Sequence, residues 1–448
     1  MRIKGTVWYR RLWRKFQQEL RWLTPGLGVK RWIGLILAGT TLFGVGFAMF
    51  LLEIYRTTPN NWLVPVLSTA SLRFLDRPLR VILFGGFGVS LILLGTWGLN
   101  RTLLKPFMRP GKAILDTMTT YRRKDRGPRI VAIGGGTGLS ALLRGLKDYT
   151  HNLTAIVTVA DDGGSSGELR RSIGVLPPGD IRKCLAALSD DEALLTQLFQ
   201  YRFAEGAGVN GHTLGNLLIT ALAEITGSFE EGVAESGRVL AVQGRVLPST
   251  LHDVRLVADV RMPNTEGDVR IKGESRIPEA AGQVRRVWLE PNNPLAYPPA
   301  LQAILAADII VIGPGSLYTS ILPNLLVPDL ADAIRASRAI KFFVCNVATQ
   351  PGETDFYNCG DHARTVEKHV GDHFFDMLVY NRNFSKKLPA NIEWVSPDKD
   401  LDQQYVTYGA DLIDEDFPWR HNSCKLAQLI LDLYSEKTGP LISKEESN

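Results

Sequence analysis

The chain has 448 residues, of which 45% are hydrophobic and 22% charged, so it is globular in composition and longer than one typical domain. Its net charge of +5 is unevenly distributed: residues 1–129 carry 22 of the 51 Lys and Arg residues but only five of the 46 Asp and Glu residues. The remainder is acidic, which argues against a nucleic-acid-binding body. The four cysteines form no CxxC pair, which argues against a zinc site and a disulfide framework.

Two apolar segments near the N-terminus, residues 32–52 and 81–99, contain no charged residue. Each is long enough for a helix to cross roughly 30 Å of hydrocarbon. Residues 1–31 hold nine Lys or Arg residues and the connecting loop, residues 53–80, holds four, and this bias places both termini in the cytoplasm. We therefore expect a two-helix transmembrane hairpin over residues 32–99 that anchors a cytoplasmic domain to the inner membrane.

The rest of the chain divides into three parts. Residues 100–127 form a basic linker. It is expected either to lie along anionic lipid headgroups or to be simply solvated, and the sequence favours neither alternative. Residues 128–435 form the body, and residues 436–448 are expected to be a disordered tail. In the body, short runs of Val, Ile and Leu alternate with helical patterns, which predicts an α/β fold: a doubly wound, Rossmann-like parallel sheet covered on both faces. The predicted strands and the loops that follow them occupy residues 129–136, 153–162, 308–316, 341–350 and 376–383.

The loops after these strands are all polar or rich in glycine, and ligands of such sheets bind at the carboxyl ends of the strands. IGGGTGLS, which contains Gly134–Gly138, lies between a strand and a helix, where backbone N–H groups and the helix dipole attract anions. It is neither a P-loop nor a complete GxGxxG motif. An anion-binding turn is favoured over a plain tight turn. GPGS, residues 313–316, repeats the pattern and predicts a second such turn.

VADDGGSSGELR, residues 159–170, raises three alternatives: a metal site, a phosphate-binding loop or a plain turn. Its position after the second strand, close behind the first glycine-rich turn, favours a loop that faces a diphosphate. In this interpretation Ser165 and Ser166 meet phosphates. Asp161 and Asp162 meet sugar hydroxyls or a magnesium ion bound to the phosphates.

Three further polar residues are candidates for ligand contact. Asp180 follows a rigid Pro-Pro-Gly turn, where helix capping and ligand binding are equally good explanations. His212 and Asn216 stand at a predicted helix start in NGHTLGNLL, and ligand contact is slightly favoured over a structural role. No second histidine has metal-ligand spacing to His212. Because no nucleophile–base pair is evident, the pattern suits binding, or direct transfer onto a bound acceptor.

Six motifs in order resemble the gluconeogenesis-factor family (YvcK), the bacterial branch of the CofD-like superfamily, over residues 130–435: IGGGTGLS, TVADDGGSSGELR, LPPGDIRKCLAAL, NGHTLGNLL, GPGSLYTSILPNLLV and TQPGETDFYNCGDH. The resemblance implies a regulatory factor, more a binding protein than an enzyme, that binds UDP-sugars such as UDP-N-acetylglucosamine and needs no cofactor. It further implies roles in gluconeogenic growth, cell-wall precursor supply and cell shape. The implied alternative is a magnesium-dependent transferase of the 2-phospho-L-lactate transferase type, with Asp161 and Asp162 as metal ligands.

The resemblance also implies site residues and partners. Arg420, in PWRHNSCKLAQLI, would grip the UDP-sugar, since an arginine fork suits phosphate oxygens. The expected partners are glucosamine-6-phosphate synthase or another cell-wall enzyme, the inner membrane and a second copy of the chain. The predicted hairpin departs from the usual soluble member of the family. The implied nucleotide and phosphate contacts are Gly135, Gly136, Thr137, Gly138, Gly315 and Ser316.

Overall fold

The computed structural model forms two compact units, residues 1–122 and residues 123–448. The second unit, called the body below, contains every strand of the two sheets. The residues that the structure describes are 40–42, 44–45, 47–48, 76–104, 123–189, 194–204, 208–263, 266–280 and 282–438.

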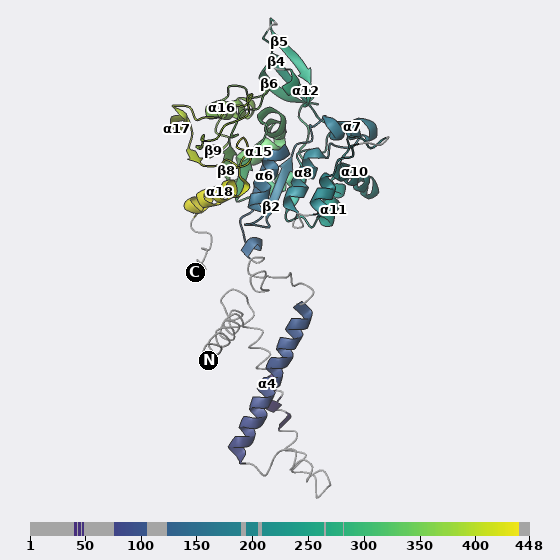
Figure 1. The fold of residues 1–448 in the computed structure, drawn as a ribbon, viewed down its shortest axis with the longest axis vertical. Helices are drawn as coiled ribbons and strands as arrows, with labels where there is room; N and C mark the ends of the chain where they lie inside the picture. The colour runs from purple at the N-terminus through teal and green to yellow at the C-terminus, as the bar shows by residue number, and fades with distance from the viewer. Residues whose placement is uncertain are drawn as a thin grey trace, which may run out of the picture. The chain divides into compact units, whose positions relative to one another are not determined.

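The long helix of the N-terminal unit, α4 (Arg77–Leu104), contains the second predicted membrane segment, residues 81–99, and continues into the predicted linker (Figure 1). Of the first predicted segment, residues 32–52, only seven positions are described, and all seven are helical. Among the described residues, no helix is long and apolar enough to cross a membrane. The predicted transmembrane hairpin therefore lacks support in the structure, because a hairpin needs two complete spans.

Seven parallel strands form the central sheet of the body, in the order β10-β9-β8-β7-β1-β2-β3. All residues of β1, β2, β7 and β9 are buried, which explains the nearly continuous apolar runs in the sequence. The predicted α/β fold with a Rossmann-like parallel sheet is confirmed. The strand bounds are β1 Ile130–Gly134, β2 Leu153–Val157, β3 Arg245–Pro248, β7 Ile309–Ile312, β8 Ile340–Val344, β9 Met377–Asn381 and β10 Thr407–Ala410.

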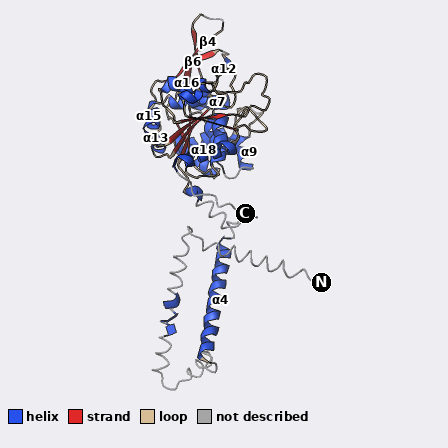
Figure 2. Ribbon diagram, turned by 90° about the vertical axis from the view of Figure 1, so that its left-hand side faces the viewer, coloured by secondary structure: helices blue, strands red, loops and turns tan. Residues whose placement is uncertain are grey.

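Helices cover both faces of this sheet (Figure 2). Helices α6, α8 and α18 pack together over one face, and α13 and α15 pack together over the other. α18 includes residues 436–438, which the sequence assigned to the tail, and residues 439–448 lie outside the described residues. The helix bounds are α6 Gly136–Leu146, α7 Gly164–Ile173, α8 Gly179–Leu188, α9 Leu194–Gln200, α10 Leu214–Thr226, α11 Phe229–Val239, α12 Arg276–Glu279, α13 Pro298–Leu305, α14 Leu322–Leu325, α15 Pro328–Ala336, α16 Cys359–Val370, α17 Leu401–Gln404 and α18 Ser423–Thr438.

The order of the strands reverses between β1 and β7. From β1 the chain adds β2 and β3 on one side, and from β7 it adds β8, β9 and β10 on the other. Ile130 of β1 is accordingly paired with Leu153 on one side and with Ile309 on the other. Because neighbouring loops diverge at such a switch point, a ligand crevice is expected beyond the ends of β1 and β7.

A second, antiparallel sheet has the order β5-β4-β6 and projects from one end of the body (Figure 1). Its strands are β4 (Arg255–Arg261), β5 (Asp268–Lys272) and β6 (Gln283–Glu290). The pattern of apolar runs in the sequence did not predict this sheet. The turn between β5 and α12 returns from it to the ligand edge of the central sheet, and this turn supplies a residue of the candidate site.

Candidate functional site

A cavity of about 690 Å³ lies at the carboxyl ends of the central strands. Four of the five predicted strand-end loops contribute to its lining, and the loop after β9 does not. The buried Asn381 at that end instead accepts a hydrogen bond from the backbone N–H of Leu412 (3.2 Å). The predicted site residues that line the cavity are Gly135, Gly136, Thr137, Gly138, Asp161, Asp180, Gly315, Ser316 and Arg420.

The first glycine turn, residues 134–138, leads from β1 into helix α6. Its N-cap residue, Gly135, is extended and provides no side-chain cap, so the first N–H groups of α6 have no side-chain acceptor from it. Gly136 has φ +65°, a conformation that favours glycine. An uncapped helix N-terminus attracts anionic oxygens through these N–H groups and the helix dipole. The turn is therefore suited to a phosphate.

The second glycine turn, residues 313–316, lies directly against the first. A Cβ atom on Gly138 would approach the carbonyl oxygen of Pro314 to 2.6 Å, so the two turns can touch only because position 138 is glycine. The turn is held from β8: the N–H of Gly315 donates to Asn346 Oδ1 (3.3 Å), and Gln350 Nε2 donates to Ser316 Oγ (2.6 Å). The hydroxyl hydrogen of Ser316 remains available to a ligand.

Acidic side chains form another part of the lining. Asp180 is the second residue of α8, whose N-cap is Pro178, so Asp180 does not cap the helix. Its carboxylate instead accepts a hydrogen bond from Lys183 Nζ (2.9 Å). It also lies so close to Gly135 that a Cβ atom there would be 2.6 Å from Asp180 Oδ2. Asp161 and Glu274 line the same cavity, and sequence reasoning missed Glu274 and Lys183.

Crowding of carboxyl groups changes their protonation. Burial, followed by the neighbouring charge of Asp180, raises the pKa of Asp161. Burial, together with Asp161, Asp180 and further carboxylates, raises the pKa of Glu274 to about 8. Glu274 therefore holds a proton at neutral pH and can donate a hydrogen bond. Glu274 follows a strand of the antiparallel sheet, so the rule that ligands bind at the ends of parallel strands did not identify it. The neighbouring Gly273 was the one feature of the sequence that could have marked it as a candidate.

The segment from Asp414 to His421 also contributes to the lining. Of this segment, the sequence predicted only Arg420 as a site residue. Phe417 and Trp419 line the cavity beside Arg420. His421 also lines it, and burial, partly offset by a hydrogen bond to the backbone of Cys345, lowers the pKa of His421 to about 4. The imidazole is therefore neutral at physiological pH.

Four predicted site residues lie together but outside the lining of the cavity. Ser165 Oγ is 3.0 Å from His212 Nδ1 and accepts a hydrogen bond from Asn216 Nδ2 (2.9 Å). Asn216 Oδ1 accepts from Arg182 Nε of α8 (2.9 Å). Ser166 forms a hydrogen bond with Asp161 that lowers the pKa of this carboxyl group, but burial raises the pKa by more. This buried network positions the loop that carries Asp161, and none of the four residues lines the cavity.

The two aspartates of the predicted metal site diverge. Asp161 lines the cavity, whereas Asp162 lies outside the lining and accepts a hydrogen bond from the backbone N–H of Ser275 (2.9 Å). Within the described ranges, no group of three or more His, Cys, Asp or Glu residues could hold a metal ion. Magnesium commonly needs only one or two protein carboxylates in addition to substrate phosphates. Asp161 and Asp180 fit that smaller requirement.

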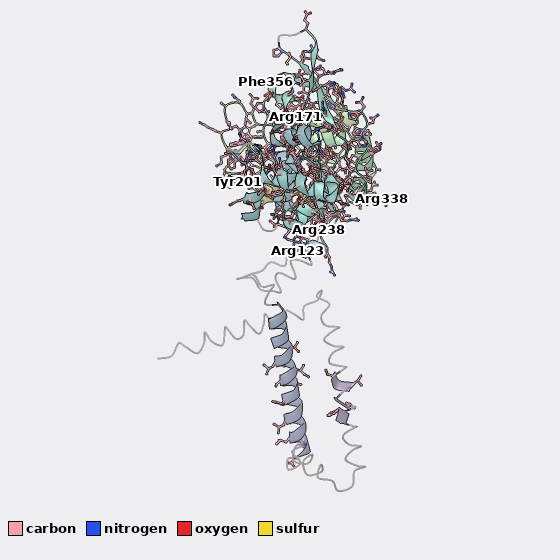
Figure 3. All side chains as sticks on the ribbon, turned by 90° about the vertical axis from the view of Figure 1, so that its right-hand side faces the viewer. Arg123, Arg171, Tyr201, Arg238, Arg338 and Phe356 are labelled. Carbon is pink, nitrogen blue, oxygen red and sulfur yellow. The ribbon has the colours of Figure 1, made fainter. Side chains whose placement is uncertain are left out.

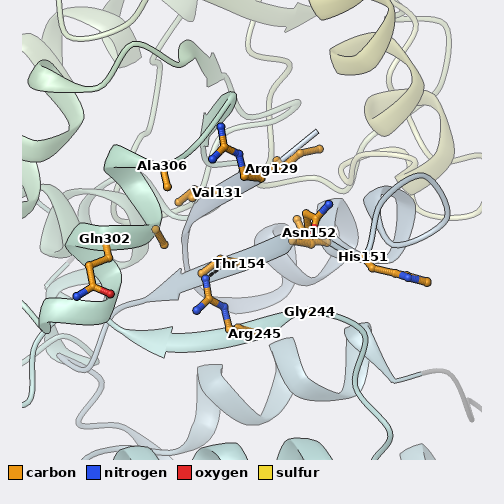
Figure 4. Close-up of a pocket in the computed structure, with 12 residues that line it drawn as sticks. Arg129, Val131, His151, Asn152, Thr154, Gly244, Arg245, Gln302 and Ala306 are labelled. Carbon is orange, nitrogen blue, oxygen red and sulfur yellow. Dashed lines mark hydrogen bonds between the residues drawn. The ribbon is translucent and has the colours of Figure 1, made fainter. Parts of the chain in front are cut away.

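Two other cavities differ from this one in chemistry. One, of about 550 Å³, lies at the amino ends of β1 and β2 and is lined by Arg129, His151 and Arg245 (Figure 4). Arg129 also forms an ion pair with Asp308 (2.7 Å). The other, of about 470 Å³, is lined by Phe356, whose side chain is 84% exposed. Neither contains a glycine turn at the start of a helix.

Known proteins of similar sequence identify the family of this chain. The family described as 2-phospho-L-lactate transferase CofD matches residues 130–416. A putative gluconeogenesis factor from Nostoc sp. is 46% identical over 443 residues, which cover 94% of this chain and 93% of the relative. The chain belongs to the gluconeogenesis factor family. Its CofD domain lies within the body and contains the glycine turns and the acidic residues of the cavity.

Two shorter relatives match only about two thirds of this chain. The gluconeogenesis factor of Bacillus subtilis is 45% identical over 327 residues, covering 69% of this chain and 99% of that protein. A crystal structure of a Bacillus halodurans protein of the UPF0052 family matches with a TM-score of 0.64 and 42% identity, covering 68% of this chain and 99% of that one. The longer Nostoc alignment extends beyond the body, so part of the N-terminal unit is shared with that relative.

Proposed function

We propose that this gluconeogenesis factor binds a UDP-sugar, UDP-N-acetylglucosamine, and acts as a regulatory factor in gluconeogenic growth, cell-wall precursor supply and cell shape. The observation that carries the proposal is the contact of two glycine turns, residues 134–138 and 313–316, at the switch point of the sheet. Two adjacent anion-binding turns suit two linked phosphates better than they suit one carboxylate.

The remaining lining supports a nucleotide-linked sugar. The cavity volume of about 690 Å³ lies within the range of ligand pockets. The carboxyl groups of Asp161, Asp180 and Glu274 line the same cavity and suit sugar hydroxyls. The aspartates, when ionised, would also repel a further phosphate. Arg420 supplies a positive charge to the same lining.

Calorimetric titration of the full-length chain with UDP-N-acetylglucosamine tests the proposal. The wild-type protein should bind, and Arg420→Ala should weaken binding by roughly tenfold or more, since charge-assisted hydrogen bonds contribute about 1.5–3 kcal/mol. Arg338→Ala is the matched control, because Arg338 is exposed just before β8, at the amino edge of the sheet (Figure 3). Absence of binding heat from the wild-type protein would reject the proposal.

A transferase of the 2-phospho-L-lactate transferase type is the second candidate, and the acidic part of the cavity favours it. Asp161 and Asp180 would hold a magnesium ion together with ligand phosphates, and the ion would neutralise charge on the transferred group. Glu274, protonated at neutral pH, would donate a proton to the leaving phosphate oxygen, while the acceptor hydroxyl would lose its own proton to an ionised carboxylate of the lining. The neutral, buried His421 is poorly suited to that task.

The second candidate is tested with the full-length chain, magnesium, a nucleotide-linked 2-phospholactate donor and a deazaflavin acceptor. Product should form in the presence of magnesium, and Glu274→Gln should slow its formation while Glu279→Gln, an exposed neighbour on α12, leaves it unchanged. Absence of product, combined with binding of UDP-N-acetylglucosamine, would leave the regulatory function as the sole proposal.

The location at the inner membrane, the cell-wall partner enzyme and self-association remain predictions. For location we rely on the apolar sequence around residues 32–99 and on large apolar side chains of α4 that are exposed, such as Ile82 and Phe87. Cell fractionation tests it: the full-length chain should stay with membranes after an alkaline carbonate wash, and a chain without residues 1–122 should not. Recovery of both proteins in the soluble fraction would refute the predicted location.

A further inference from the structure

The segment of residues 414–420, called the aromatic loop below, closes on itself. The N–H of Asp414 donates to the carbonyl oxygen of Arg420 (2.9 Å), and the N–H of Arg420 donates to that of Phe417 (2.8 Å). Asp414 Oδ1 also accepts hydrogen bonds from the N–H groups of Asp416 and Phe417, each 3.0 Å long. The loop therefore has a fixed shape before any ligand binds, which lowers the entropic cost of binding.

The loop presents three side chains with flat faces to the cavity: Phe417, Trp419 and Arg420. The rings of Phe417 and Trp419 lie edge to face, with centroids 5.5 Å apart and an interplanar angle of 80°. The guanidinium carbon of Arg420 lies 5.1 Å from the centroid of the Phe417 ring. Phe417 is 47% exposed, so it is not a core residue, and its apolar surface faces water in the ligand-free protein.

The chemistry of the cavity changes from one part to the next. The first glycine turn offers N–H groups to anions and the second offers the hydroxyl of Ser316, whereas Asp161, Asp180 and Glu274 offer oxygens to hydroxyls. The aromatic loop adds the carboxyl groups of Asp414 and Asp416 and the charge of Arg420, and it also contributes the aromatic rings of Phe417 and Trp419 to the lining. A planar heterocycle stacks on aromatic rings and on arginine, a contact that contributes about 1–3 kcal/mol per base. A hydroxyl-rich sugar gains less from such a surface.

We infer that the aromatic loop is the nucleobase subsite, in which Trp419 and Phe417 stack on the base while the glycine turns hold the diphosphate and the carboxyl groups hold the sugar. This inference rests on the proposed function. It adds an orientation of the ligand in the cavity, and it assigns recognition of the nucleotide to residues other than Arg420.

Titrations of the full-length chain with UDP and with inorganic pyrophosphate test the inference, because pyrophosphate lacks the base. Trp419→Ala should weaken UDP binding about 5- to 150-fold, the equivalent of 1–3 kcal/mol, and change pyrophosphate binding less than twofold. Trp419→Phe keeps a stacking surface and should retain most of the affinity for UDP. Phe356→Ala, which removes an exposed ring outside this cavity, is the control (Figure 3).

A spectroscopic readout accompanies the titrations. UDP should quench tryptophan fluorescence of the wild-type protein, and the quenching should be lost in Trp419→Phe. Because Trp419→Phe should still bind UDP, misfolding would not explain the lost quenching. The inference is overturned if Trp419→Ala leaves UDP binding intact or weakens both ligands equally. If the wild-type protein binds neither UDP nor UDP-N-acetylglucosamine, the proposed function itself fails.

Discussion

The carboxylate of Asp162 accepts a hydrogen bond of 2.9 Å from the backbone N–H of Ser275, although 113 positions separate the two residues. The contact joins the loop after β2 to the turn that carries Glu274 into the cavity. Gly273, before that turn, has φ +110°, and a Cβ atom there would collide with Asp162 Oδ2. Asp162 therefore positions the turn, and it does so without lining the cavity.

Substitution of Asp162 distinguishes this positioning role from the predicted contact with a diphosphate or metal. Asp162→Ala should destabilise the protein by about 1–2 kcal/mol, because the N–H of Ser275 loses its acceptor. Asp162→Asn keeps an oxygen acceptor and should remain near wild type both in denaturant unfolding and in affinity for UDP-N-acetylglucosamine. A large loss of affinity in the correctly folded Asp162→Asn protein would restore Asp162 to the ligand site.

Gly138 permits the contact between the two glycine turns. Gly138→Ala places a methyl group 2.6 Å from the carbonyl oxygen of Pro314, so one turn must move, at a cost of about 1–3 kcal/mol. We expect lower stability together with a loss of ligand affinity. Gly237→Ala is the matched control: its methyl group meets only ordinary contacts inside α11 and should stabilise the helix by about 0.5–1 kcal/mol. Equal behaviour of the two variants in thermal unfolding and titration would contradict the proposed contact.

Glu274 makes the stability of the protein depend on pH. Burial, with Asp161 and Asp180, raises its pKa from an ordinary value of 4.5 to about 8. Between these values the folded protein retains a proton that the unfolded chain releases, so the contribution of Glu274 to stability falls as pH rises and becomes constant above about pH 8. Glu353, whose pKa burial raises to about 7, acts in the same direction.

Melting temperatures measured from about pH 6 to 9 test this dependence. The wild-type melting temperature should fall up to about pH 8 and then level off, and Glu274→Gln, which cannot lose a proton, should flatten the curve. Because Glu353 remains, the variant should retain a residual slope below neutral pH. Glu279→Gln changes an exposed carboxyl on α12 and should follow the wild-type curve. Parallel curves for the wild type and Glu274→Gln would show that Glu274 is not protonated in the folded protein.

The sequence was sufficient to predict the parallel sheet and the two glycine turns, because both depend on local chemistry. Buried parallel strands need continuous apolar runs, and a turn with a positive φ, as at Gly136, favours glycine. The same patterns placed Asp161 at the end of β2, and the structure puts this residue in the cavity.

The residues that were missed or displaced depend on contacts between distant segments. Glu274 reaches the cavity from an antiparallel insertion, which the alternation of strands and helices did not reveal. Trp419 lies next to Arg420, but its role depends on the closure of the aromatic loop. Ser165 and His212 have polar side chains beside glycines, as ligand-binding residues do, yet they form a hydrogen bond with each other and do not line the cavity. Sequence spacing does not distinguish a buried pair from an exposed one.

A crystal structure of the full-length protein with UDP-N-acetylglucosamine would test the central claim most directly. We expect the diphosphate to lie against the N–H groups of residues 136–138 and beside Gly315, the base to stack on Trp419, and the sugar to contact Asp161 and Asp180. Density for the ligand in another cavity, such as the one beside Arg129, or a diphosphate that does not contact the glycine turns, would contradict it.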